Sequence, residues 1–513
     1  MKTLPFWLGL ACLGLALPSV AQTDADALRY SWQQFGGTAR TQAIGGATTA
    51  VGADLGVLST NPAGLGLYRQ SEFSFTPGLG FSNTTTSGVG SPLDNNRSSL
   101  HIGSVGVVFT NRLADNDNSS DWRGSSFAIG ATRINDFNSR FHYKGNVADG
   151  QTFFEYLRES PATQDDLDAE YGLNGDNITT LDGLGYGAYL TNVNQDEQGR
   201  DYVSTINRSE PVSIDETVST TGSQTQYDFG YGASYRDKVY LGASLGVVRT
   251  RYNQLREYSE AEADVNTAFT SLLLRDEVNT TGTGINVRFG VIYRASDQLR
   301  IGASVQTPTF SSLTDTYKTS LSTNFSGLQV TNSDGTISTI NDAMAVTRPS
   351  ESNYNLTSPF RANVGGALVV GKNGFVSADV EYVNYGQARL HADEEGSTDD
   401  EAYFDGQNQA VADKYKSAVN VRLGGELRAD IFRFRLGYAL YGDPFKSNEA
   451  DRTRAYYTGG VGLRQKNTFL DLSGVYTTGT STYSPFDLAN GRQPLLTVDS
   501  HRFTTSFTVG KLF

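Results

Sequence analysis

Short stretches in which apolar and polar side chains alternate recur from Ser71 to the C-terminus of this chain. Between Phe432 and Tyr441 the even positions hold Phe, Phe, Leu, Tyr and Leu, whereas the odd positions hold Arg, Arg, Gly, Ala and Tyr. A strand of a transmembrane β-barrel needs about 9–11 residues, and its side chains point alternately to lipid and to the lumen. The pattern therefore predicts that the even face of residues 432–441 contacts lipid.

The lengths of the connections separate such a barrel from a soluble β-sandwich, whose strands alternate as well. The alternating stretches predict 14 strands, over residues 71–83, 99–112, 124–138, 225–236, 238–252, 283–295, 297–312, 357–370, 373–388, 416–428, 430–442, 453–465, 467–479 and 499–513. Between the strands, tight turns such as 236–238 alternate with long polar segments, which lie at 139–224, 253–282, 313–356, 389–415 and 480–498. Outer-membrane barrels have short periplasmic turns and long extracellular loops. We therefore predict an all-β fold, a 14-stranded antiparallel transmembrane β-barrel over residues 69–513, with a short helix near 153–157 in the first long loop.

The N-terminus has the features of a cleaved secretory signal. Lys2 supplies a positive charge, Leu4 to Leu17 form an apolar stretch, and Ser19-Val20-Ala21 is a small-residue cleavage site. We expect residues 1–21 to be removed and the mature protein to reside in the cell outer membrane of a diderm bacterium. No later stretch approaches the ~20 apolar residues of a transmembrane helix, so any membrane span is expected to consist of strands.

Composition and motifs argue against several other classes of protein. With 41 basic and 55 acidic residues, the formal net charge is −14, which makes nucleic acid a poor partner. The only cysteine, Cys12, lies in the predicted signal, and the four histidines have no metal-ligand spacing. No phosphate-binding loop, nucleophile elbow or zinc-protease motif occurs. We expect no enzyme activity, no cofactor and no metal, and we interpret the acidic run from Asp393 to Glu401 as a solvated loop in preference to a calcium site.

Residues 22–68 are small, glycine-rich and poorly alternating, and they carry a recognisable motif. Gly36-Gly37-Thr38-Ala39-Arg40 leads into Ile44-Gly45-Gly46-Ala47, and Asn61-Pro62-Ala63-Gly64-Leu65 follows. This segment resembles the start of the FadL-type family of hydrophobic-compound transporters. Ser358-Pro359-Phe360-Arg361, 378–382 and 435–438 extend the resemblance into the barrel.

The resemblance implies a monomeric barrel that is plugged by an N-terminal hatch, residues 22–68. A hydrophobic ligand would be captured at the outer loops and released sideways through an opening in the wall. Asn61, Pro62, Ala63 and Gly64 would form a tight turn of the hatch, in which proline fixes one dihedral angle and Gly64 permits a positive one. This turn either takes part in gating or only packs the hatch.

Parity within the strands also predicts a set of charged residues that face the lumen. They are Arg288, Arg294, Arg361, Asp379, Glu381, Arg422, Glu426, Arg433, Arg435 and Asp471. Opposite charges in a narrow barrel pair readily. An ion-pair lattice that holds the plug to the wall is the favoured interpretation, and a site for an anionic head group such as a carboxylate is the alternative.

Two functions therefore remain open. The first is passive transport of hydrophobic small molecules, either long-chain fatty acids or aromatic hydrocarbons, across the outer membrane. The second is a non-transporting barrel that binds exported proteins through the loops at 139–224 and 313–356, for secretion or surface attachment. In either case we expect contacts with outer-membrane lipid and lipopolysaccharide, and recognition of the last strand, which ends at Phe513, by the barrel-assembly machinery.

Overall fold

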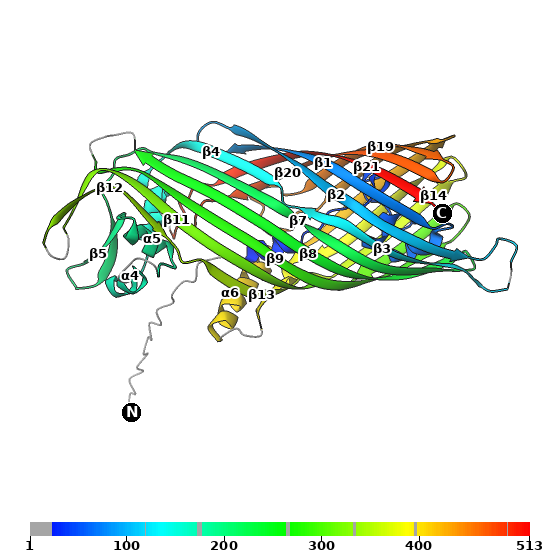
Figure 1. Ribbon diagram of the computed structural model, residues 1–513, viewed down its shortest axis with the longest axis horizontal. Coiled ribbons are helices and arrows are strands. Elements are labelled where there is room, and N and C mark those ends of the chain that lie inside the picture. The colour runs from blue at the N-terminus through cyan, green and yellow to red at the C-terminus, as the bar shows by residue number, and fades with distance from the viewer. Residues whose placement is uncertain are drawn as a thin grey trace, which may run out of the picture.

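The computed structural model describes residues 23–117, 119–171, 177–262, 267–331, 335–393, 398–489 and 491–513. The predicted signal peptide and part of the acidic run, Glu394 to Ser397, lie outside the described residues. Figure 1 shows a long barrel of tilted strands with the N-terminal segment inside it. Among the described residues, no helix is both long enough and apolar enough to cross a membrane.

In the described part of the chain, eighteen strands build the barrel wall, and four pairs of them lie end to end, so that the wall has fourteen positions. The strands are β1 (Glu72–Ser87), β2 (Leu93–Arg112), β3 (Trp122–Asp136), β4 (Ser139–Val147), β7 (Val212–Tyr235), β8 (Val239–Glu262), β9 (Phe269–Arg294), β10 (Leu299–Gln306), β11 (Phe310–Thr331), β13 (Ser350–Thr357), β14 (Arg361–Val370), β15 (Gly374–Asn384), β16 (Arg389–Ala392), β17 (Ser417–Ala429), β18 (Phe432–Tyr441), β19 (Arg454–Gln465), β20 (Thr468–Tyr483) and β21 (Leu496–Leu512). Neighbouring strands pair antiparallel, and β21 pairs with β1, which closes the barrel. The predicted 14-stranded antiparallel barrel is confirmed.

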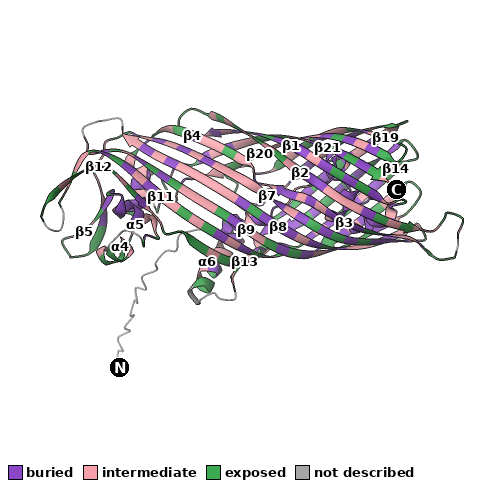
Figure 2. Ribbon diagram, in the orientation of Figure 1, coloured by how far each residue is buried: buried purple, intermediate pink, exposed green. Residues whose placement is uncertain are grey.

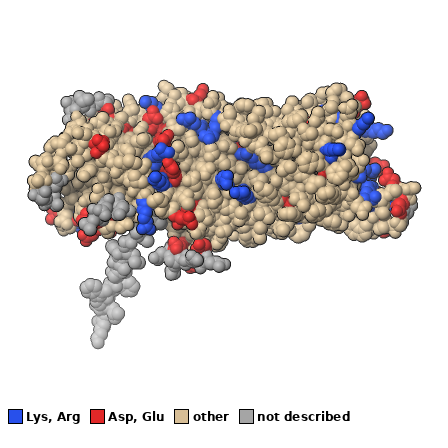
Figure 3. All heavy atoms as spheres, viewed as in Figure 1, with Lys and Arg blue, Asp and Glu red and all other residues tan. Residues whose placement is uncertain are grey.

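The outer surface near the tight turns is an apolar belt. On β18, Phe432, Phe434 and Leu436 are exposed, whereas Arg435 and Ala439 are buried, as the alternation predicts. The same alternation of exposed and buried residues runs along most strands (Figure 2), and charged side chains are sparse on the outer face of this half (Figure 3). A bilayer covers such a belt, so the end with the tight turns is periplasmic and the other end is extracellular.

The strands continue well beyond the apolar belt, and here the sequence-based boundaries were wrong. Much of the predicted loop 253–282 is strand, because β8 runs to Glu262 and β9 begins at Phe269. On β9 above the belt, Leu272 and Leu274 are buried, whereas Arg275 lies on the exposed face. Outside the bilayer the outward face of a strand meets water, so the pattern expected of a lipid-facing strand is lost there. The predicted loops 139–224 and 313–356 contain further strands for the same reason.

A cap covers the extracellular end of the barrel. It consists of η3 (Asp149–Gln151), α3 (Phe153–Arg158), α4 (Gln164–Tyr171), α5 (Leu181–Gly187), the hairpin β5 (Thr191–Gln195) and β6 (Asp201–Thr205), and the strand β12 (Ile337–Val346). The helix predicted near 153–157 is confirmed as α3. The residues between 389 and 415, which were expected to be a polar loop, instead contain the helix α6 (Thr398–Lys414).

Four wall positions are interrupted where two strands lie end to end. The break between β10 and β11 contains Pro308, and the neighbouring break between β13 and β14 contains Pro359. Proline has no N–H to donate, so it cannot continue a ladder of hydrogen bonds. The two breaks are joined instead by Ser358, whose hydroxyl accepts the Thr309 N–H at 2.9 Å. The short helix η4 (Tyr385–Gln387) separates β15 from β16, and a kink at 137–138 separates β3 from β4.

Candidate functional site

The N-terminal segment from Thr23 to Tyr68 lies in the lumen and is called the hatch below. It contains α1 (Asp24–Ser31), α2 (Ala39–Ala43), η1 (Leu55–Ser59) and η2 (Pro62–Leu67). Asp54 holds its middle together, because its carboxylate accepts hydrogen bonds from the hydroxyls of Thr38 at 2.8 Å and Thr41 at 2.7 Å. The backbone N–H of Gly56 donates to the same carboxylate. A single buried acid thus fastens α2 to η1.

The motif Asn61 to Gly64 packs the hatch against the wall. The Asn61 side chain accepts the N–H of Ala63 and donates to the carbonyl oxygens of Thr49 in the hatch and Val291 in β9. Pro62 is the first residue of η2, where its missing N–H costs nothing. Gly64 does not adopt a positive φ, contrary to expectation. Glycine is required at this position because any larger residue would clash with the hatch: a Cβ there would lie 2.8 Å from Val57 Cγ1.

Two glycines of the wall allow this close approach. A Cβ on Gly290 of β9 would lie 1.8 Å from Asn61 Oδ1, and a Cβ on Gly242 of β8 would lie 2.3 Å from the Pro62 carbonyl carbon. The hatch turn therefore rests directly on the backbone of two adjacent strands, which is a contact that only glycine permits.

In the described part of the chain, six of the ten predicted lumen charges form two groups of ion pairs. In the group nearer the extracellular end, called the upper group, Glu381 pairs with Arg361 at 3.2 Å and with Arg422 at 2.9 Å. In the lower group, Glu426 pairs with Arg435 at 2.8 Å and with Arg428 at 2.9 Å, and Arg435 continues to Asp471 at 2.7 Å. These carboxylates are buried, and each accepts hydrogen bonds from more than one guanidinium.

The hatch joins this lattice through residues that strand parity could not reveal. Arg40 of α2 pairs with Glu426 at 3.3 Å, and the backbone N–H of Thr49 donates to Asp379 at 2.8 Å. Arg288 reaches the hatch as well, since its guanidinium donates to the Leu58 carbonyl oxygen at 2.6 Å. Arg40 lies in the motif of the hatch, but nothing in the sequence indicated its partner.

Two further predicted lumen residues lie near the periplasmic turns. Arg433 lies at a periplasmic turn and donates to the carbonyl oxygens of Asp430 and Phe432. Arg294 pairs at 2.9 Å with Asp297, which is almost fully exposed in a neighbouring turn. Both side chains lie where the lumen opens to the periplasm, and neither joins the two ion-pair groups.

Above the hatch, aromatic side chains from the hatch and the wall form a continuous layer. Trp32 stacks on Tyr385, with ring centroids 5.7 Å apart and planes inclined by 14°, and Phe35 contacts Tyr456 at 5.1 Å. Tyr30, Phe137 and Tyr252 pack edge to face beside them. Asp315 of β11 lies in the same layer, and its carboxylate accepts a hydrogen bond from the Tyr317 hydroxyl at 2.8 Å. The layer is predominantly apolar with a few hydroxyl groups, as ligand pockets commonly are.

The wall has a seam beside this layer. β2 pairs with β3 only from Ser104 to Arg112, and among the described residues Leu93 to Gly103 have no ladder partner on that side. The chain at the kink turns into the lumen instead. Arg502 of β21 pairs there with Asp136 at 3.3 Å, and the Thr84 hydroxyl of β1 donates to the Arg140 carbonyl oxygen.

The hatch is attached to the strand that forms the seam. The side-chain amide of Asn135 donates to the carbonyl oxygens of Arg29 at 3.2 Å and Trp32 at 2.9 Å. The backbone N–H of Gln34 donates to the Ile134 carbonyl oxygen at 2.9 Å. A displacement of the hatch near Trp32 would therefore act directly on the kinked end of β3.

The start of the hatch also contacts the extracellular helix α6. Asp24 accepts hydrogen bonds from the ammonium group of Lys414 at 3.0 Å and from the hydroxyl of Tyr415 at 2.9 Å. One segment thus connects a helix of the extracellular end, the aromatic layer and the seam.

No known protein family matches this chain by its sequence, and no curated protein does so either. Solved structures do match over nearly the whole chain. A Pseudomonas aeruginosa FadL homologue gives a TM-score of 0.52 at 11% identity and covers 93% of this chain and 98% of its own. The toluene transporter TodX of Pseudomonas putida gives 0.50 at 13% identity and covers 93% and 99%. The chain therefore has the fold of the FadL-type outer-membrane channels.

Proposed function

We propose, from this FadL-type fold, that the barrel conducts hydrophobic small molecules passively across the outer membrane. Long-chain fatty acids and monoaromatic hydrocarbons such as toluene are the candidate ligands, because the matched channels include a FadL homologue and a toluene transporter. The observation that carries the proposal is that the wall is interrupted between β2 and β3 beside a lumen that the hatch plugs. A ligand insoluble in water can leave through such a seam without crossing an aqueous pore.

The route follows the elements that touch the hatch. A ligand enters below the cap, lies against the aromatic layer around Trp32 and Tyr385, and leaves between β2 and the kinked end of β3. The hatch turn Asn61–Gly64 stays fixed on Gly290 and Gly242 and acts as the pivot. The ligand gradient drives the flux, so the barrel needs no cofactor and performs no chemistry.

Export and assembly complete the proposal. The chain enters the envelope through its signal peptide, residues 1–21, and the strand that ends at Phe513 is recognised by the assembly machinery. We infer that the barrel works as a monomer, and the pairing of β21 with β1 of the same chain supports this, because the wall closes without a strand from a second copy. Its charged outer surface beyond the apolar belt contacts lipopolysaccharide (Figure 3).

The test measures uptake of a labelled long-chain fatty acid and of toluene by cells that lack endogenous channels of this fold. Cells that express the protein should take up at least one of the two faster than cells with an empty vector. A variant without residues 22–66 serves as the control for sealing, since the lumen should then admit small hydrophilic solutes as well.

Equal uptake with and without the protein, for both probes and at equal expression, would contradict the transport proposal. The barrel that binds exported proteins through its cap would then be the better explanation. Purified protein with and without the cap would distinguish the two, because only that second function requires the cap for binding.

A further inference from the structure

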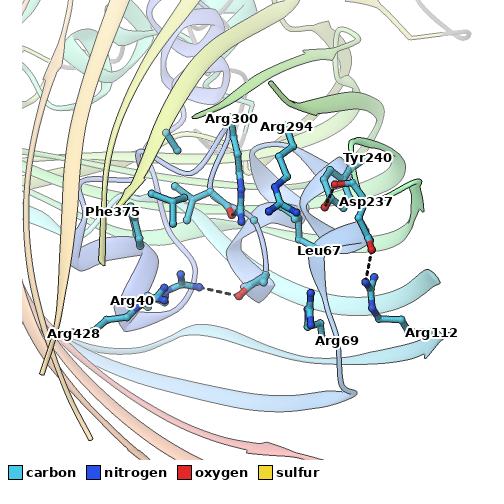
Figure 4. A pocket seen from close by; sticks show the side chains of 16 residues that line it. Arg40, Leu67, Arg69, Arg112, Asp237, Tyr240, Arg294, Arg300, Phe375 and Arg428 are labelled. Atoms are coloured by element: carbon cyan, nitrogen blue, oxygen red, sulfur yellow. Dashed lines mark hydrogen bonds and ion pairs between the residues drawn. The ribbon is translucent and has the colours of Figure 1, made fainter. Parts of the chain in front are cut away.

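A cavity of about 280 Å³ lies between the underside of the hatch and the periplasmic rim of the barrel. The hatch lines one side of it with Arg40, Val51 to Ala53, and Gly66 to Leu67. The other side comes from the periplasmic ends of the wall strands, and Figure 4 shows arginine side chains converging on the space from both sides. This cavity is distinct from the aromatic layer, which lies above the hatch.

The lining of this cavity is strongly cationic. Six arginines line it, and Asp237 is the only carboxylate among the lining residues; the arginines are Arg40, Arg69, Arg112, Arg294, Arg300 and Arg428. Arg112 pairs with Asp237 at 2.8 Å, and Arg40 and Arg428 share Glu426. Arg69 and Arg294 pair with acids on the rim, Asp115 and Asp297, which are 77% and 96% exposed and so are largely screened by water. The cavity therefore holds more positive than negative charge.

Of the six lining arginines, Arg300 is the one that has no carboxylate partner among the described residues. Its one hydrogen bond that joins hatch and wall goes to the Val51 carbonyl oxygen at 3.1 Å. Its Nε is buried and has no hydrogen-bond acceptor among the described residues. A partly buried guanidinium without a carboxylate is incompletely compensated, and an anion in the cavity would supply the missing partner through paired N–H donors.

The lining is also apolar on one side. Val51 and Leu67 of the hatch and Val369 and Phe375 of the wall face the cavity beside the arginines. The Arg40 guanidinium lies 5.9 Å from the centre of the Phe375 ring, so charge and hydrocarbon surface are adjacent. An inorganic anion would use only the arginines, whereas a molecule with a charged head and a hydrocarbon tail would use both surfaces.

We propose that this cavity binds the carboxylate of an anionic amphiphile that enters it from the periplasm, with Arg300 as its principal ion-pair partner. The inference deepens the proposed transport function and rests on it, because it assigns carboxylates such as fatty acids, in preference to neutral hydrocarbons, as the ligands of the periplasmic end. Arg69, which is 67% exposed, marks the opening of the cavity to the periplasm.

The test is a calorimetric titration of the full-length protein, purified in a non-ionic detergent. Octanoate is the probe, because it stays soluble as a monomer; octanol, which has the same chain without the charge, and inorganic phosphate, which has the charge without the chain, are the comparisons. Arg300→Gln removes the principal charge. Arg69→Gln removes a rim charge, and its matched control is Arg236→Gln, an arginine at another periplasmic turn that is 60% exposed, pairs with one surface acid, Asp121, and does not line the cavity.

Octanoate should bind the unmodified protein and Arg236→Gln equally, and Arg300→Gln about tenfold or more weakly, because a hydrogen bond to a charged group contributes about that factor. The affinity of Arg69→Gln for octanoate should lie between that of the unmodified protein and that of Arg300→Gln. Equal binding of octanol and octanoate, no effect of Arg300→Gln, or phosphate binding as tightly as octanoate would each overturn the proposal. The titration measures binding without transport. If octanoate binds the purified protein but cells that express it take up neither probe faster than cells with an empty vector, the proposed transport function is contradicted and the binding site is not.

Discussion

At the scale of single residues, the lumen depends on carboxylates that each hold more than one arginine. Glu381 holds Arg361 and Arg422, and Glu426 holds Arg40, Arg428 and Arg435. Buried ion pairs gain little over an apolar core, yet removal of one partner leaves an uncompensated charge. The alternation of residues in the strands predicted that Glu381, Glu426 and their partners Arg361, Arg422 and Arg435 face inward. It could not predict which of them meet, because partners such as Arg40 and Glu426 are brought together only by the fold.

Glu381→Gln should therefore lower the free energy of unfolding by about 3–5 kcal/mol, because two buried guanidinium groups lose their carboxylate. The measurement is urea unfolding of the barrel in lipid vesicles. Glu277→Gln is the matched control, since Glu277 pairs with Arg275 at 2.9 Å while both are more than 40% exposed. That exposed pair should contribute less than about 1 kcal/mol. Equal unfolding midpoints for the two variants would contradict the assignment of Glu381.

At the scale of elements, the hatch is held by close contacts as well as by charges. The turn at Asn61 lies on the backbone of β8 and β9, and the carbonyl oxygen of Thr49 lies about as close to Gly302 of β10, where a Cβ would approach it to 2.2 Å. The motif Asn61 to Leu65 predicted a turn. The glycines that receive the turn lie more than 170 residues further along the chain, and nothing in the sequence linked them to it.

Gly290→Ala should displace the hatch turn, because its new methyl group would overlap Asn61. We expect a loss of stability of about 1–3 kcal/mol, as for other overpacked sites, and leakage of small hydrophilic antibiotics through the lumen. Gly366→Ala is the control. It lies on β14, where the nearest atom to a new Cβ is 3.8 Å away. If both variants exclude antibiotics as well as the unmodified barrel does, the turn does not seal the lumen.

At the scale of the whole molecule, two separate bodies lie across the path through the barrel. The hatch is anchored to the lower wall through Glu426 and Asp379, and the cap packs on the extended upper wall. Phe153 of α3 donates its N–H to Glu260 of β8, and the Ala188 carbonyl oxygen accepts the Thr323 hydroxyl of β11. The cap and the hatch thus use different anchors, and removal of one leaves the anchors of the other in place.

Replacement of residues 148–211 by Asn-Gly should give a barrel that still folds, because Val147 and Val212 are already paired across β4 and β7 and a two-residue turn joins such strands. The lumen should remain sealed to hydrophilic antibiotics, since the hatch keeps its contacts. Antibiotic sensitivity and the resistance of the folded barrel to SDS are the measurements. A folded but leaky barrel would show that the cap, not the hatch, closes the path.

The class of fold, the number of wall positions and the lipid-facing side of the strands could be predicted from the order of amino acids alone. These follow from side-chain periodicity, which is a local property that the bilayer imposes on every strand within it. The folded chain was needed to show how far strands such as β9 extend above the bilayer, where the β2 ladder ends, and which charges pair. It also placed Arg40, Arg69 and Arg300 around one cavity. Such features depend on contacts between residues that are distant in sequence, and the register of a closed barrel, not any local pattern, sets these contacts.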